Sequence, residues 1–205
     1  MDRSNGQKIQ QFVDNRIDSL IRISNQSLFS SMMAKLRRGV GKEPGSVPEL
    51  WEMMFDGFPA ELAGKGPQPS AGERAVHTVL TLFALHQQSK DIRAKCMHEP
   101  GVSLGQAVGR LIKAKSERDE AIKRRFMTVV TANDIDELVW HLRGLVQLFR
   151  DEDVPLDYGW LAKDLFYFQF SNYQDYIRLH WGRGLYLKPN ENSVGEEGGV
   201  VHAAQ

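Results

Sequence analysis

Residues 103–130 have the side-chain chemistry of a phosphate-binding surface. This stretch contains seven basic and three acidic residues, although the whole chain of 205 residues has 26 of each. The basic residues are Arg110, Lys113, Lys115, Arg118, Lys123, Arg124 and Arg125. Lys and Arg bind the phosphates of nucleic acids without reading the base sequence. A charged helix face is also often merely solvated, so the stretch indicates either a nucleic-acid surface or an ordinary polar face.

Charge is distributed unevenly along the rest of the chain. Residues 1–150 hold 22 Lys and Arg against 17 Asp and Glu, whereas residues 151–205 hold 4 against 9. A neutral protein with this asymmetry can present a basic face to nucleic acid. The acidic run Asp151, Glu152 and Asp153 suggests, as a hypothesis, that the C-terminal part faces a basic region of a partner.

One pattern matches a catalytic motif. Residues 101–105, GVSLG, fit the G-x-S-x-G elbow of α/β-hydrolases, and Asp157 and His180 follow in the chain order of a triad. An elbow needs a buried strand before its serine, but the residues before Ser103 are charged and end in proline. Ser103 is better interpreted as the N-cap of a helix, and we expect no enzymatic activity.

A second pattern could begin a metal site. Cys96 and His98 lie two residues apart, but a closed zinc site needs four ligands of the Cys and His class, and none nearby completes the set. A chain with one cysteine also forms no internal disulfide, which fits a reducing compartment. We expect no metal and no cofactor.

Helices must position all of these residues. Apolar residues recur at helical spacing in 7–21, 27–41, 104–113, 117–130 and 135–149, and the aromatic-rich segments 158–170 and 172–187 form two closing helices. Ser70 with Glu73 and Ser103 with Gln106 have the spacing of capping boxes. In 27–41 the expected buried face is Met32, Leu36 and Val40. Asn133 is expected to cap the helix over 135–149, whose strong pattern places it at the centre of a bundle.

These elements predict an all-α fold of two packed helical bundles without a sheet. The expected divisions are an N-terminal helical domain over 1–99, a C-terminal bundle over 102–187 and a disordered tail over 188–205, rich in Gly, Glu and Asn. No apolar run reaches the roughly 20 residues that span a bilayer, and the first 16 residues have no signal-peptide pattern. We expect a cytoplasmic protein.

Several segments, in their order along the chain, resemble those of the CasB family. CasB proteins are the small subunits of the type I-E CRISPR Cascade complex. The segments are AKLRRGVGKEPGSVPELW (34–51), the block from Leu104 to Arg150, VPLDYGWLAKDLFYF (154–168) and YIRLHWGRGLY (176–186). The resemblance covers roughly residues 9–187. It implies an all-helical, non-enzymatic subunit, present in two copies, that contacts the backbone subunits and the large subunit of an RNA-guided effector. The implied nucleic-acid partners are the crRNA and the target DNA.

The resemblance also implies a role for individual residues. By match to the basic motifs of the family, the expected nucleic-acid-binding residues are Arg37, Arg38, Arg110, Lys113, Arg118, Arg124, Arg125 and Arg143, and Lys123 flanks Arg124 on the same outward face. Because targets vary with the guide, contacts to phosphate alone would hold the displaced DNA strand. The alternative is a helical scaffold whose basic face binds acidic protein partners.

Overall fold

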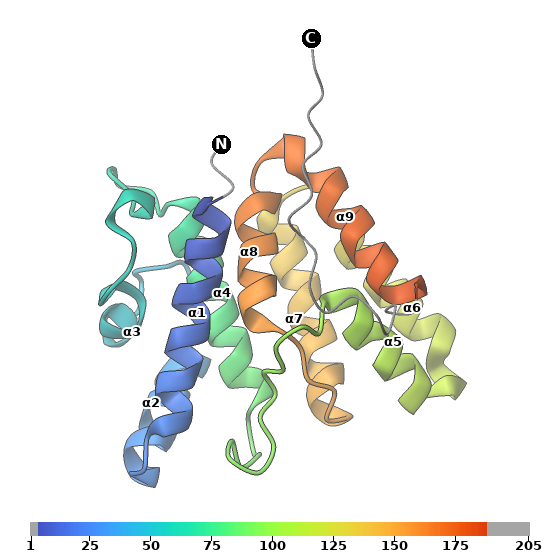
Figure 1. Cartoon of the computed structure of the whole chain (residues 1–205), viewed down its shortest axis with the longest axis horizontal. Coiled ribbons are helices and arrows are strands. Elements are labelled where there is room, and N and C mark those ends of the chain that lie inside the picture. Colours follow the sequence, from blue (N-terminus) through green and yellow to red (C-terminus); the bar gives the residue numbers. More distant parts are fainter. Residues whose placement is uncertain (1–3, 188–205) are drawn as a thin grey trace.

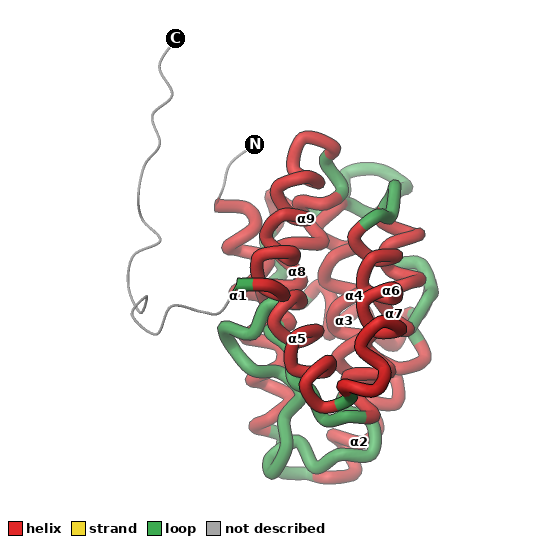
Figure 2. Tube along the Cα trace, turned by 90° about the vertical axis from the view of Figure 1, so that its right-hand side faces the viewer, coloured by secondary structure: helices red, strands yellow, loops and turns green. Residues whose placement is uncertain are grey.

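The computed structural model describes residues 4–187, and within this range every regular element is helical (Figures 1 and 2). The α-helices are α1 (Ser4–Arg22), α2 (Gln26–Arg38), α3 (Trp51–Phe55), α4 (Ala71–His86), α5 (Leu104–Ala114), α6 (Asp119–Val130), α7 (Ile135–Asp151), α8 (Tyr158–Phe168) and α9 (Ser171–Tyr186). Three short 3-10 segments join them, at Pro48–Leu50, Ala60–Leu62 and Ser116–Arg118. The all-α prediction is confirmed. The predicted tail, 188–205, lies outside the described residues.

Helix boundaries follow the polar caps of the sequence. Both capping boxes form: Ser70 Oγ accepts the backbone N–H of Glu73 at 3.1 Å, and Ser103 Oγ accepts that of Gln106 at 3.3 Å. The cap of α7 is Asp134, because its Oδ1 accepts the N–H of Glu137 at 2.9 Å. The prediction of an Asn133 cap was therefore wrong by one residue.

The centre of the molecule is formed by α4 and α8. Figure 1 shows α8 beside α1, and α8 also packs against α4 and α9. Nearly every residue of α8 is buried, because apolar side chains occur on all sides of the helix and its buried acidic residue, Asp164, is hydrogen-bonded to Trp181. The prediction that 135–149 occupies the centre was wrong: α7 is amphipathic and keeps one face in solvent.

Packing joins the first and second halves of the chain. The buried apolar residues form one continuous cluster, to which α1, α4, α7 and α8 all contribute. The pair α5 and α9 packs closely, and α6 packs on both α5 and α7. In α2 the buried face is Phe29, Met33 and Leu36. Leu36 was expected there, but the other two expected residues, Met32 and Val40, are only half-buried. The division into two domains stays a prediction.

Three hydrogen bonds, one buried and two part-buried, connect elements of the second half of the chain. The indole Nε1 of Trp181 donates to Asp164 Oδ2 at 2.7 Å. Arg178 donates from Nε to the carbonyl of Val130 and from Nη2 to that of Ala132, both at 2.9 Å, at the C-terminal end of α6. Among residues 4–187, no helix is long and apolar enough to cross a membrane.

Candidate nucleic-acid interface

Helix α6 presents part of the predicted basic cluster to solvent. Its buried residues are Ile122, Phe126 and Val129. This stripe turns Arg124 and Arg125 outward, and both are exposed. Arg124 Nε donates to the backbone carbonyl of Glu120 at 3.3 Å. The guanidinium of Arg125 has no ion pair or hydrogen bond with any described residue, so its charge is available to an external anion.

Helix α7 presents a tryptophan and an arginine on its solvent side. Its buried residues are Leu138, Leu142, Leu145, Val146 and Phe149. Trp140 and Arg143, three residues apart, lie off this stripe and are exposed. Arg143 was among the residues expected from the sequence to bind nucleic acid, whereas Trp140 was not. The sequence does predict that Trp140 is exposed, because two helical steps of about 100° from the buried Leu138 place Trp140 on the opposite side of the helix from the core.

A tight turn after α2 brings a further lysine to α7. Gly39 has no room for a side chain, since a Cβ there would lie 2.7 Å from Leu50 Cδ1 and 2.9 Å from Thr81 Cγ2. His77 Nε2 donates to the carbonyl of Gly39 at 3.0 Å, and burial lowers the pKa of His77, so the ring stays neutral. Gly41 has φ +73°, a conformation that side chains rarely adopt. The turn leaves Lys42 exposed.

These three segments meet at a group of cations that we call the basic junction: Lys42, Arg125 and Arg143. Arg125 Nη1 lies 3.7 Å from the position that a Cβ would occupy at Gly144, so the α6 side chain reaches over α7. Arg143 Nη1 lies 3.7 Å from the corresponding position at Gly41, next to Lys42. None of the three residues has an ion pair within residues 4–187.

A cleft of about 260 Å³ adjoins the basic junction, between the turn, α4 and α7. Lys42, Trp140 and Arg143 line it, together with Arg74. Its acidic groups are already engaged, because Arg74 pairs with Glu43 at 3.7 Å and with Asp136 at 3.3 Å. The cations that remain unpaired can bind an anion from outside the chain.

Other predicted residues have acidic partners inside the fold. Arg38 pairs with Glu49 at 3.4 Å, and Arg110 forms a bidentate pair with Glu99, with both N···O distances 3.0 Å. Lys123 contacts Asp119 at 2.8 Å and Glu120 at 3.6 Å, and the hydrogen bond to Asp119 raises the pKa of Lys123. These three charges are partly neutralised within the chain. Their roles as nucleic-acid ligands are untested, and their internal pairing makes them weaker candidates than the residues of the basic junction.

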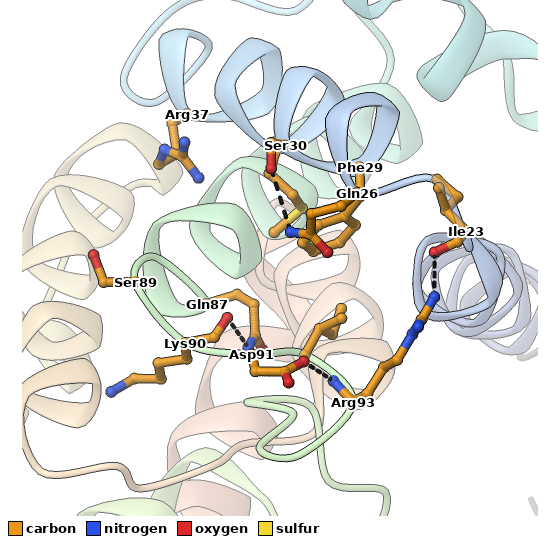
Figure 3. A pocket seen from close by; sticks show the side chains of 12 residues that line it. Ile23, Gln26, Phe29, Ser30, Arg37, Gln87, Ser89, Lys90, Asp91 and Arg93 are labelled. Atoms are coloured by element: carbon orange, nitrogen blue, oxygen red, sulfur yellow. Dashed lines mark hydrogen bonds between the residues drawn. The ribbon is translucent and has the colours of Figure 1, made fainter.

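Arg37 lies in a different place from the basic junction. It lines a second cleft, of about 530 Å³, between α2 and the segment 87–93, as Figure 3 shows. There Arg93 donates to the carbonyl of Ile23 at 2.8 Å (Figure 3). Lys113 and Arg118 are exposed on α5 and before α6, without an ion pair in the described chain. The structure thus distributes the nine predicted residues over several surfaces.

The acidic run at the end of α7 is also paired internally. Asp151 pairs with Arg150 at 3.0 Å, and Glu152 pairs with Lys115 at 3.3 Å. Asp153 pairs with Lys90 and Lys95, and these hydrogen bonds lower its pKa. The hypothesis that this run faces a basic partner stays untested, and these pairs offer a sufficient structural role for the three residues.

The residues of the hydrolase pattern have structural roles. Ser103 caps α5. Asp157 caps α8, because its Oδ1 accepts the N–H of Trp160 at 2.8 Å, and its Oδ2 accepts the N–H of Gly101 in the loop before α5 at 2.7 Å. No hydrogen bond joins Ser103, Asp157 and His180 to one another in the described chain. The elbow expected of a hydrolase is replaced by the start of a helix.

His98 has neighbours that the sequence did not reveal. Asp14 of α1 and Asp157 offer oxygen atoms within 4.8 Å of a His98 nitrogen and of each other. His98 Nδ1 accepts the N–H of Tyr158 at 3.1 Å, and Nε2 faces Asp14 Oδ1 at 3.7 Å. Burial, and then the Asp157 charge, raise the pKa of Asp14 to about 6. The group connects α1, the 87–103 segment and α8, whereas Cys96 lies outside it.

Comparison with known proteins identifies the family. Residues 32–186 match the family model of the CRISPR-associated protein Cse2. The chain belongs to the Cse2 family. CasB from Thermobifida fusca is 36% identical, with 87% of this chain and 97% of that one covered and a TM-score of 0.71. The resemblance to CasB found in the sequence motifs is confirmed.

More distant structures share the fold. A Cse2-family protein from Thermus thermophilus is 24% identical, with 85% of this chain and 97% of that one covered and a TM-score of 0.61. A chain of a CRISPR RNA-guided surveillance complex is 22% identical, with coverage of 86% and 95% and a TM-score of 0.65. Among curated proteins, none matches this sequence.

Proposed function

We propose that this Cse2-family protein is the non-catalytic small subunit of a CRISPR RNA-guided surveillance complex, the type I-E Cascade. Its family membership and the shared fold of a chain from such a complex support this assignment. In this proposal its partners are the backbone and large subunits, a second copy of itself, the crRNA and the target DNA. Its place would be the cytoplasm, where the guide meets invading DNA.

Within that complex, the protein binds nucleic acid without sequence preference and holds the displaced DNA strand. Opening a duplex to form an RNA–DNA hybrid is a nearly balanced exchange, so contacts to strand backbones can favour it. The observation that carries the proposal is the basic junction. Lys42, Arg125 and Arg143 come from segments that are distant in the sequence but lie next to one another in the fold, and none has a counter-ion in the described chain.

Binding of the purified protein to single-stranded DNA of random sequence, measured over a salt series, tests this role. Each phosphate contact contributes about −0.7 to the slope of log K against log salt. The variant Lys42→Gln/Arg125→Gln/Arg143→Gln should therefore lose affinity and about 2 of the slope.

A matched control removes the same charge from residues that pair internally, Arg38→Gln/Arg110→Gln/Lys123→Gln. It should keep most of the affinity and the slope. If the two variants bind alike, or if the wild type fails to bind, the basic junction does not hold a strand. In that case docking on acidic protein surfaces becomes the better explanation.

A further inference from the structure

Trp140 is the most exposed of the large apolar side chains in the described chain, with 74% of its surface accessible. Its ring contacts that of His141 edge-on, with centroids 4.8 Å apart and planes at 79°. Its indole N–H makes no hydrogen bond with a described residue. A single exposed apolar residue is common on protein surfaces, so the surroundings of Trp140 decide what it can bind.

Those surroundings are cationic. Trp140 lines the cleft together with Lys42 and Arg143, and Arg143 is three residues further along the same side of α7. The acidic side chains that line the cleft, Glu43 and Asp136, pair with Arg74. A cationic ligand would be repelled here, and an apolar helix would bury two unpaired charges at a large cost. An acidic peptide would satisfy the cations but leave the indole without a partner.

One class of ligand satisfies both features. An unpaired nucleobase offers a flat π-face for an aromatic side chain, and its neighbouring phosphates offer anions for Lys and Arg. We propose that Trp140 stacks on one unpaired base of a nucleic-acid strand whose flanking phosphates lie on Lys42 and Arg143. This inference rests on the proposed function and adds to it a base-stacking position that is indifferent to sequence, because every base has a π-face.

Two DNA strands of equal length separate stacking from phosphate contact. One is a thymine strand, and the other carries the same phosphates on abasic sugars. The wild-type protein should bind the thymine strand about 5- to 150-fold more tightly, the range of one stacked base. Trp140→Ala should bring this ratio close to 1 while it leaves the salt slope unchanged. Trp140→Phe should restore part of the preference.

Tyr176→Ala is the matched control, because Tyr176 is also a highly exposed aromatic residue but lies on α9, away from the cleft. It should keep the wild-type ratio. The same strands made as uridine RNA distinguish DNA from RNA as the source of the base. Far-ultraviolet circular dichroism checks that each variant remains helical.

The outcomes separate this inference from the proposed function. If the wild type binds both strands with the same affinity and a clear salt slope, phosphate contact stands and stacking is wrong. A Trp140→Ala ratio equal to the wild-type ratio also refutes stacking. If the wild type binds neither strand, both proposals are refuted.

Discussion

A matched pair of glycine substitutions on α5 tests how closely α5 packs against α9. Gly105 lies where α5 crosses α9. A Cβ at Gly105 would lie 2.7 Å from the backbone N of Leu185 and 3.0 Å from the carbonyl carbon of Gly184, and closer still to the Trp181 carbonyl oxygen. Gly109, one turn later, differs: the nearest atom to its Cβ position is the Leu185 oxygen at 3.7 Å.

The two substitutions should therefore change stability in opposite directions. Alanine in a helix is favoured over glycine by about 1 kcal/mol. Gly109→Ala should gain about that amount. In Gly105→Ala the obstacle is backbone, which cannot rotate away, so an overpacking cost of about 3 kcal/mol applies. The net loss for Gly105→Ala is about 2 kcal/mol.

Thermal unfolding followed by circular dichroism measures both effects. For a protein of this size 1 kcal/mol corresponds to about 2–4 °C in Tm, so Gly105→Ala should unfold about 4–8 °C earlier and Gly109→Ala about 2–4 °C later than the wild type. Equal Tm values for the two variants, or a Gly105→Ala protein as stable as the wild type, would refute the close crossing of α5 and α9.

Three further substitutions probe separate contacts. Burial raises the pKa of Asp164 from 3.8 to about 6, so the folded protein favours the protonated carboxyl. The stability that this proton contributes is present below about pH 4 and is lost as pH rises through 6. Relative to the wild type, Asp164→Asn should thus raise the free energy of unfolding by about 2 kcal/mol more at pH 7.5 than at pH 4. A difference in urea midpoint between variant and wild type that does not change with pH would contradict this. Arg178→Lys keeps the charge but cannot reach the carbonyls of Val130 and Ala132 together. It should lose about 2 kcal/mol in urea unfolding, and wild-type stability would contradict this. Gly41→Ala places a side chain at φ +73° and should lower the free energy of unfolding by about 1–2 kcal/mol. It should also weaken binding to single-stranded DNA, because the turn positions Lys42. Unchanged stability would show that the turn relaxes to accept the side chain.

Apolar periodicity and capping residues in the sequence were sufficient to predict most helices, but not to predict which helix is most deeply buried. The capping boxes at Ser70 and Ser103 depend on neighbours three residues away, so the sequence contains them completely. The periodic 135–149 segment was placed at the centre because its pattern is strong. A strong pattern means one buried face and one exposed face, whereas α8, with apolar side chains on all sides, is the helix that packs on several others.

The candidate site was less predictable because ion pairing is a tertiary property. The Arg110 pair with Glu99 and the Arg38 pair with Glu49 join residues 11 positions apart across loops. By contrast, the Lys123 pair with Asp119 is an i,i+4 pair and could have been read from spacing. The convergence of Arg125, Arg143 and Lys42 depends on how α6, α7 and the turn pack, which no local pattern contains.

Photo-crosslinking in the reconstituted surveillance complex is the most direct test of the central claim. The displaced DNA strand would carry 4-thiothymidine at successive positions, and crosslinked peptides would be identified by mass spectrometry. We expect crosslinks within residues 39–44, 119–130 and 135–151 of this protein, lost in the variant Lys42→Gln/Arg125→Gln/Arg143→Gln and kept in Arg38→Gln/Arg110→Gln/Lys123→Gln. A displaced strand that crosslinks to none of these three segments, in a complex that contains the protein, would contradict a strand-holding role for the basic junction.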